Sequence, residues 1–370
     1  MANDNNYINS AKVYHPSERY KQQSHISSLE EYKRLYKKSI EDPGKFWREI
    51  AVKNFYWERE PSEKNFLQYN FDPTKGSIFV EWMKGAKTNI CYNAVDRIIE
   101  QGQGDKVAYI WEGNTPGEER KITYNELKIE VSKFANVLKS FGIQKGSRVA
   151  IYMPVTIELV VAMLGCARIG AIHTVVFAGF SAEALADRMV DARCSVLVTA
   201  DGYYRGNKLI QLKEISAEAL ERCYENGNRI KTCIVHRRIN LPVIVTGNGS
   251  ITNSHLPNGQ PLIRRQTNGI INGSNGNSTA ASIVNGNVNS ILTSNGSINL
   301  ANHCLSNNNN IAMNRNGQTA PVLQPQIPLK AISWNYSIDV WWDKVMSEAS
   351  SECEPVWVDA EDPLFILYTR

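Results

Sequence analysis

The chain lacks the patterns that mark exported, membrane-spanning and zinc-binding proteins. No apolar run approaches the roughly 20 residues that a membrane span requires, and the first six residues have neither the basic region nor the apolar core of a signal peptide. The seven cysteines are scattered, with no Cys-x-x-Cys pair and no histidine pair nearby at zinc-ligand spacing. We therefore expect a cytoplasmic protein with reduced cysteines, no metal site and no membrane contact.

Two common catalytic signatures are missing as well. No Gly-x-Gly-x-x-Gly follows an expected strand, so the chain has no sequence for the phosphate cradle of a dinucleotide-binding dehydrogenase. It also has no Gly-x-Ser-x-Gly, the turn that carries the nucleophile of α/β-hydrolases. These absences argue against both enzyme classes.

Acidic side chains are missing from residues 226–338, which carry eight Lys or Arg and no Asp or Glu. The remaining chain has 33 basic and 37 acidic residues, so the net charge of +4 belongs to this one segment and does not indicate nucleic-acid binding. Within the segment, residues 240–328 are rich in Asn, Gly and Ser and show no helix or strand period. They cannot bury enough apolar surface to offset the entropy of ordering, so we expect a long disordered insertion.

Expected strands and helices alternate regularly between residues 147 and 208. The strands cover residues 148–153, 171–177 and 195–200, and the helices cover residues 156–169 and 181–192. Thr156 and Ser181 can cap the two helices with their side-chain oxygens. Strands that are apolar on both faces need cover on both faces, which indicates an α/β fold with a largely parallel sheet flanked by helices. Ligands of such sheets bind at the carboxyl ends of the strands.

A basic segment follows the third strand and is the best candidate binding site. Arg205 and Lys208 lie three positions apart around Gly206, where the missing Cβ lets both side chains and the backbone approach one anion. A guanidinium can also lie flat on a nucleotide base while its edge reaches a phosphate. Without further information, a solvated loop is the simpler interpretation of these charges.

Other elements complete the expected fold. His173 lies among apolar strand residues, so a buried core histidine is a simpler interpretation than a catalytic base. Arg188 should form solvent-exposed ion pairs with Asp187 and Asp191 on one helix. Further helices are expected at 209–224 and 338–347, and a final strand at 364–368.

Six collinear motifs make the chain resemble the acetyl-CoA synthetases of the adenylate-forming superfamily, of the eukaryotic cytosolic type. The motifs are Val149–Pro154, Ala162–Ala171, Phe177–Ser181, Tyr204–Lys208, Trp341–Trp342 and Ala360–Thr369. The resemblance runs from about residue 28 to residue 369 with one long interruption. In the family the last motif leads into a phosphate-handling loop, whereas here only Arg370 follows. The resemblance therefore implies an incomplete adenylate-forming N-terminal domain.

The resemblance also implies an activity and a site. The complete protein would activate acetate with ATP and Mg²⁺ to an acetyl adenylate and transfer the acetyl group to CoA, its partners being these small molecules. The implied CoA-binding residues are Phe177, Ala178, Gly179, Arg205, Gly206, Asn207 and Lys208. The family's phosphate loop, acyl pocket and catalytic lysine lie beyond Thr369, so we assign no catalytic residue and no ATP or Mg²⁺ ligand to this chain.

Two alternatives to an N-terminal fragment of an acetate:CoA ligase stay open. In the first, the chain is a natural short form without catalysis that acts as a CoA-binding or partner-binding module. In the second, it is part of a propionate-preferring ligase. The expected segments are an extended arm (1–27), the first part of the adenylate-forming domain (28–239), the disordered insertion (240–328) and a continuation of the same domain (329–370), truncated before the phosphate loop.

Overall fold

The computed structural model describes residues 14–245, 263–264 and 330–369. The chain divides into two compact units, one comprising Met1–Ile263 with Ala331–Arg370 and the other Arg264–Lys330. The second unit lies almost wholly outside the described residues, so the fold given below is that of the first.

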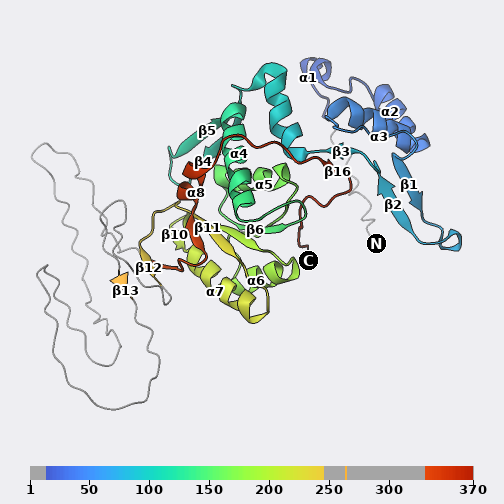
Figure 1. Ribbon diagram of the computed structural model, residues 1–370. Helices are drawn as coiled ribbons and strands as arrows, with labels where there is room; N and C mark the ends of the chain where they lie inside the picture. Colours follow the sequence, from blue (N-terminus) through green and yellow to red (C-terminus); the bar gives the residue numbers. More distant parts are fainter. Residues whose placement is uncertain (1–13, 246–262, 265–329, 370) are drawn as a thin grey trace, which may run out of the picture. The chain divides into compact units, whose positions relative to one another are not determined.

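The first unit is built on a five-stranded sheet in which every pair of neighbouring strands is parallel (Figure 1). In spatial order the strands are β15 (Asp339–Trp341), β11 (Thr232–His236), β8 (Val196–Ala200), β6 (Arg148–Tyr152) and β7 (Ile172–Val175). The expected strands of the 147–208 region are therefore confirmed as β6, β7 and β8. Parallel pairing explains why these strands are apolar along their whole length.

Helices cover both faces of the sheet, as Figure 1 shows for α4 and α5 on one side and α6 and α7 on the other. The helices are α4 (Tyr124–Ser140), α5 (Ile157–Arg168), α8 (Trp342–Glu348), α6 (Ala182–Asp191) and α7 (Leu212–Glu225). Alternate residues of β6 enter different cores: Val149 and Ile151 pack with α4 and α5, whereas Ala150 and Tyr152 pack with α6 and α7. The α/β prediction is thus confirmed, with one buried core on each face.

Side-chain caps account for the starts of α4, α5 and α6. Thr156 and Ser181 cap α5 and α6 as expected, accepting backbone N–H groups of Leu159 and Ala184. Thr123 and Glu126 form a reciprocal capping box at the start of α4.

Smaller elements surround the sheet. Those before it are α1 (Glu18–Gln23), α2 (Leu29–Glu41), α3 (Pro43–Asn54), β1 (Leu67–Asn70), the 3₁₀ turn Pro73–Lys75, β2 (Phe79–Trp82), β3 (Lys87–Thr88), two π-helical turns at Tyr92–Asp96 and Ile99–Gln103, and the hairpin β4 (Val107–Glu112) and β5 (Glu119–Thr123). The later ones are β9 (Tyr203–Arg205), β10 (Lys208–Ile210), β12 (Val243–Val245), β13 (Ile263–Arg264), β14 (Ile332–Trp334) and β16 (Val358–Asp359).

Three expected elements differ from the structure. The helix expected at 338–347 begins only at Trp342, because Asp339, Val340 and Trp341 pair with the open side of β11. The helix expected at 209–224 begins at Leu212, because Lys208–Ile210 forms β10. The strand expected at 364–368 is a single parallel bridge between Phe365 and His173 at the outer side of β7.

The disordered insertion expected at 240–328 falls largely outside the described residues. At its start, however, residues 243–245 form β12 and pair in parallel with β14, and the Leu241 side chain is buried. The ordered chain therefore extends at least to Val245, beyond the expected boundary. The other segment boundaries stay predictions.

Candidate functional site

The basic segment after β8 is a hairpin, not the loop that the sequence indicated. β9 and β10 are antiparallel, and Arg205 is the cross-strand partner of Lys208. Gly206, at the first central position of the two-residue turn, has φ +58°, a conformation that favours glycine and suits hairpin turns of the II′ kind. Because directly opposite residues share one face of a hairpin, both cations project from the same side.

A second turn, Phe177–Gly179, follows the carboxyl end of β7, the edge strand on the other side of β6. The Tyr203 hydroxyl donates to the Ala178 carbonyl at 3.0 Å, and the buried Tyr152 hydroxyl donates to the Phe180 carbonyl at 2.7 Å. A Cβ at Gly179 would lie 2.6 Å from the Phe177 ring, so a larger residue here would require that exposed ring to move. The turn is therefore fixed by hydrogen bonds from the ends of β6 and β9.

These two turns meet at their exposed side chains. The Arg205 guanidinium lies 5.9 Å from the centroid of the Phe177 ring, at the outer limit of a cation–π contact. Phe177 is 56% exposed although it is a large apolar residue. Neither Arg205 nor Lys208 forms an ion pair with any carboxylate in the part of the chain that the structure describes. The site thus offers two uncompensated cations beside an open aromatic ring.

The seven residues expected from the sequence therefore gather in one place. Phe177, Ala178 and Gly179 form one side, and Arg205 to Lys208 form the other, with Asn207 exposed at the tip of the hairpin turn. Such a surface can bind a polyanion through charge-assisted hydrogen bonds and a planar ring through Phe177 or the guanidinium plane.

Several supporting residues were not identified from the sequence. Asp201, fully buried at the end of β8, accepts backbone N–H groups of Gly202, Arg238, Ile239 and Leu241. This carboxylate ties the start of the β9–β10 hairpin to the chain that follows β11. Such bonds join residues up to 40 positions apart, and no local pattern signals them.

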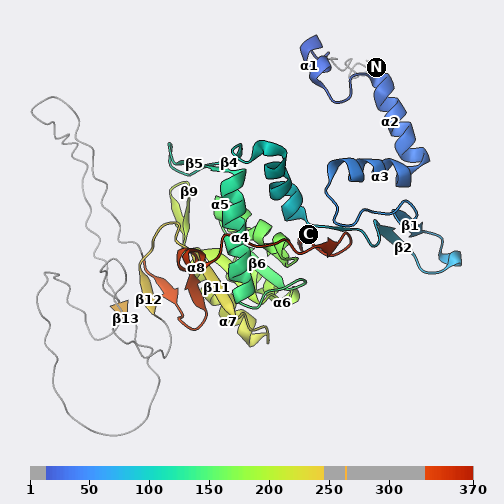
Figure 2. The same ribbon diagram turned by 45° about the horizontal axis from the view of Figure 1, so that its top comes forward.

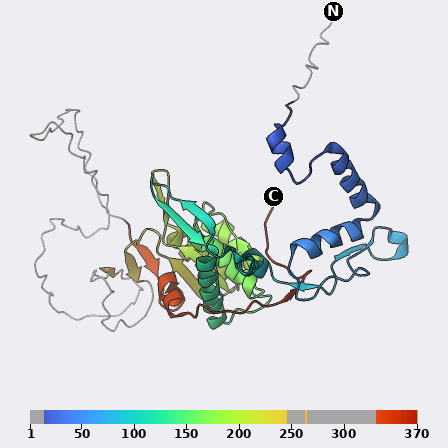
Figure 3. The same ribbon diagram turned by 90° about the horizontal axis from the view of Figure 1, so that it is seen from above.

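The hairpin β4–β5 also supports the site. In Figures 2 and 3 it lies beside the β9–β10 hairpin. The Asn114 amide, from the turn between β4 and β5, hydrogen-bonds to the backbone of Gly206.

His173 and Arg188, the other two groups considered from the sequence, both make contacts within the fold. His173 is a buried core residue, as expected, and burial lowers its pKa to about 4, so its ring is neutral at physiological pH. The expected ion pairs of Arg188 are wrong for the described residues: its guanidinium lies over the Phe180 and Tyr368 rings, and Asp191 accepts the Tyr368 hydroxyl at 2.6 Å. The guanidinium therefore contacts aromatic rings from other parts of the chain and not the exposed carboxylates of its own helix.

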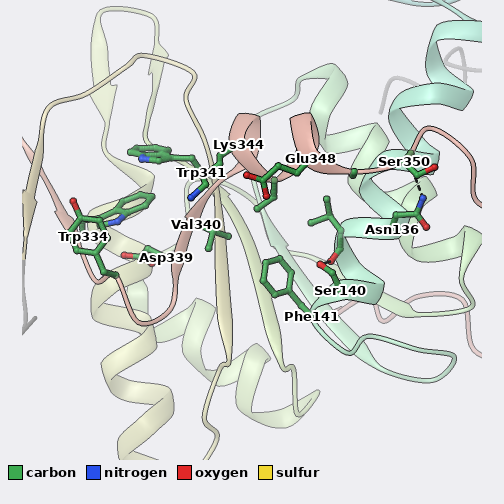
Figure 4. A pocket seen from close by; sticks show the side chains of 14 residues that line it. Asn136, Ser140, Phe141, Trp334, Asp339, Val340, Trp341, Lys344, Glu348 and Ser350 are labelled. Atoms are coloured by element: carbon green, nitrogen blue, oxygen red, sulfur yellow. Dashed lines mark hydrogen bonds between the residues drawn. The ribbon is translucent and has the colours of Figure 1, made fainter. Parts of the chain in front are cut away.

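The largest of the described cavities lies elsewhere, between α4, β15 and α8, with a volume of about 710 Å³ (Figure 4). Two of its polar side chains are held by contacts within the fold. Asn136 donates to the carbonyls of Ser350 and Glu352, and Asp339 pairs with Lys213 at 3.0 Å. Asn136 and Asp339 are therefore both engaged in structural contacts.

Within residues 14–245 and 330–369 no group of three or more His, Cys, Asp or Glu side chains is arranged to hold a metal ion. None of the helices described is both long and apolar enough to cross a membrane. The six described cysteines (Cys91, Cys166, Cys194, Cys223, Cys233 and Cys353) are buried free thiols.

Comparison with known proteins matches nearly the whole chain. A family model described as AMP-binding enzyme covers residues 96–261, and one described as acetyl-coenzyme A synthetase N-terminus covers residues 32–94. An acetyl-coenzyme A synthetase of Drosophila melanogaster is 38% identical over 96% of this chain and 42% of its own length. A chloroplastic/glyoxysomal acetyl-coenzyme A synthetase of Arabidopsis thaliana is 36% identical over 96% of this chain and 36% of its own length. An acetyl-coenzyme A synthetase of Cryptosporidium parvum is 46% identical over 59% of this chain and 30% of its own length.

The chain thus spans about two fifths of the length of the Drosophila relative, with 42% of that protein covered, and less of the others. Phe177–Gly179 and Arg205–Lys208 lie inside the range matched by the AMP-binding model.

Proposed function

Because this chain belongs to the acetyl-CoA synthetase family of AMP-binding enzymes and corresponds to its N-terminal portion, we propose that it supplies the CoA-binding surface of an acetate:CoA ligase. The reaction joins acetate, ATP and CoA to give acetyl-CoA, AMP and pyrophosphate through an acetyl adenylate. Mg²⁺ and ATP enter as substrates, and none of the described residues is assigned to them. This chain alone is proposed to be inactive.

The observation that carries the proposal is the pairing of Arg205 with Lys208 on one face of a hairpin, next to the exposed Phe177 ring. CoA has a 3′-phosphate on the ribose of its adenosine end, so it offers an anion and a planar base side by side. The guanidinium and the ammonium donate hydrogen bonds to the phosphate, and the base stacks on the guanidinium or on Phe177. Binding at this end leaves the thiol free to reach the adenylate.

Acetyl transfer to CoA follows adenylate formation, which makes the two half-reactions separable. In an enzyme extended through the rest of the family's length, Arg205 acts only in the second half-reaction. Its loss should raise KM for CoA and leave acetate-dependent ATP/pyrophosphate exchange nearly unchanged. Equal loss of both half-reactions would indicate a folding role for Arg205 instead.

The chain itself can be tested by calorimetric titration with CoA and with 3′-dephospho-CoA. We expect Arg205→Ala to weaken CoA binding about ten- to a hundredfold, since one charge-assisted hydrogen bond is lost, and to weaken dephospho-CoA binding less, since that ligand has only the base stacking to lose. Arg19→Ala removes an equally exposed cation and serves as the control. No binding of CoA by the unmodified chain, or equal binding by Arg205→Ala, would contradict the proposal.

A non-catalytic CoA-binding module is the alternative, and it rests on the same cationic site. Acetate-dependent release of pyrophosphate by the 370-residue chain would argue against it and against inactivity. Cytoplasmic location stays a prediction, and whether acetate or propionate is preferred depends on an acyl pocket that we assign to no residue here.

A further inference from the structure

The turn that presents Arg205 and Lys208 is held from outside its own hairpin. The Asn114 Nδ2 donates to the Gly206 carbonyl at 3.0 Å, and the Asn114 Oδ1 accepts the Gly206 N–H at 3.1 Å. One side-chain amide therefore satisfies both backbone groups of the glycine, as a neighbouring strand would. The two residues are 92 positions apart in the sequence.

Asn114 belongs to an element that is itself well anchored. The hairpin β4–β5 is fixed near its tip because the Trp111 indole donates to the Val155 carbonyl at 2.8 Å. The Glu118 carboxylate pairs with Arg238, whose guanidinium also lies 5.0 Å from the centroid of the Trp111 ring. Asn114 lies in the turn of this hairpin, and these contacts anchor the hairpin on both sides of that turn.

Gly206 depends on such support more than an ordinary turn residue. Its φ of +58° suits glycine, which loses more conformational entropy on ordering than other residues. Both strands of its hairpin contain only three residues, and a short two-stranded hairpin is marginally stable by itself. The direction of the Arg205 and Lys208 side chains therefore depends largely on the contacts that hold the Gly206 turn.

We infer that Asn114 is a positioning residue for the 3′-phosphate end of CoA: it fixes the Gly206 turn so that Arg205 and Lys208 converge on one phosphate. The inference rests on the proposed CoA-binding function. Asn114 acts through the backbone of the turn. The pair of bonds requires an amide side chain, because an Asp carboxylate at this position could accept from the Gly206 N–H but could not donate to the Gly206 carbonyl.

Calorimetric titration of the full chain with CoA and 3′-dephospho-CoA tests the inference. Asn114→Ala should weaken CoA binding about five- to fiftyfold, as expected for two lost hydrogen bonds, and dephospho-CoA binding much less. Asn114→Asp should also weaken CoA binding, since it loses the donated bond. Thr115→Ala, in the same turn and with no side-chain hydrogen bond among the described residues, is the matched control and should bind as the unmodified chain does.

A double-mutant cycle separates positioning from a general structural role. If Asn114 acts through Arg205, then adding Asn114→Ala to Arg205→Ala should cause much less than the additive loss of CoA affinity. Full additivity, equal weakening of both ligands, or loss of cooperative melting in Asn114→Ala would contradict the positioning role. Unchanged CoA affinity in Asn114→Ala would contradict this inference alone, whereas no CoA binding by the unmodified chain would contradict the proposed function as well.

Discussion

Arg168, inside one of the motifs shared with the acetyl-CoA synthetases, has a structural partner. Its guanidinium is buried and makes a bidentate pair with Asp96, at 2.7 and 3.1 Å, while its Nε donates to the Cys353 carbonyl. Lys128 approaches the same carboxylate at 3.1 Å. Burial alone would raise the pKa of Asp96, but the hydrogen bonds and charge of Arg168, with those of Lys128, outweigh it and leave that pKa below its usual value.

Asp96→Asn should therefore destabilise the chain by about 3–5 kcal/mol, because it leaves the Arg168 charge buried without its counter-ion. Urea unfolding at pH 7 measures the loss, with the exposed Asp187→Asn as control. Since the folded pKa of Asp96 is lowered, its contribution is complete above the unfolded value of about 3.9 and disappears as the pH falls through the folded value. The variant should lack this part of the acid dependence, and an unchanged acid profile would contradict the assignment.

At the scale of elements, a buried ion pair joins β15 to α7. The Lys213 ammonium lies 3.0 Å from the Asp339 carboxylate, and both side chains are almost completely buried. The same carboxylate accepts the Asn335 N–H at 2.7 Å. Asp339 therefore fixes the first residue of β15 against the helix that covers β11.

Lys213→Met should destabilise the chain by about 3–5 kcal/mol because it leaves Asp339 as an unpaired buried charge. The double variant Lys213→Met/Asp339→Asn should regain part of this loss, since Asn is neutral and can still accept from Asn335. Denaturant unfolding compares both with Lys231→Met, an exposed control that should stay within about 0.5 kcal/mol of the unmodified chain. A double variant that is less stable to denaturant than Lys213→Met would contradict the charge argument.

The sequence predicted elements that are largely buried. β6, β8 and α5 were identified because an apolar residue is needed at nearly every position of a two-sided strand, or at every third or fourth position of a helix. β15 was mistaken for a helix because three residues carry no readable period, and its conformation depends on β11 and Lys213. In the site, Arg205 and Lys208 could be identified by charge and spacing, whereas Asn114 and Asp201 could not, because their partners are distant in the sequence.

For the molecule as a whole, residues 364–368 beside β7 form a strip in which apolar side chains are exposed. Phe365 is 54% exposed and Leu367 is 67% exposed, although the backbone between them bonds to His173. Apolar side chains beside a strand with few backbone partners favour pairing with other chains.

The chain should therefore self-associate with increasing concentration in sedimentation velocity measurements. Leu367→Lys should reduce this association, since it places a charge in the apolar strip without removing a core contact. Val155→Lys, at a position that is 81% exposed and away from the strip, is the control and should associate like the unmodified chain. An unmodified chain that remains monomeric at all concentrations measured would contradict the prediction.

The position of β15 in the sheet also has a consequence for the order of folding. β6, β7, β8 and β11 come from residues 148–236, but β15 reaches β11 only across a long separation, as in the Arg237–Asp343 pair, whose members are 106 positions apart. Each doubling of a closed loop costs only about 0.6 kcal/mol, so the native state tolerates the distance, but such non-local pairing forms slowly. In a refolding chain, four strands can assemble first, and the free side of β11 then stays open to wrong partners for longest.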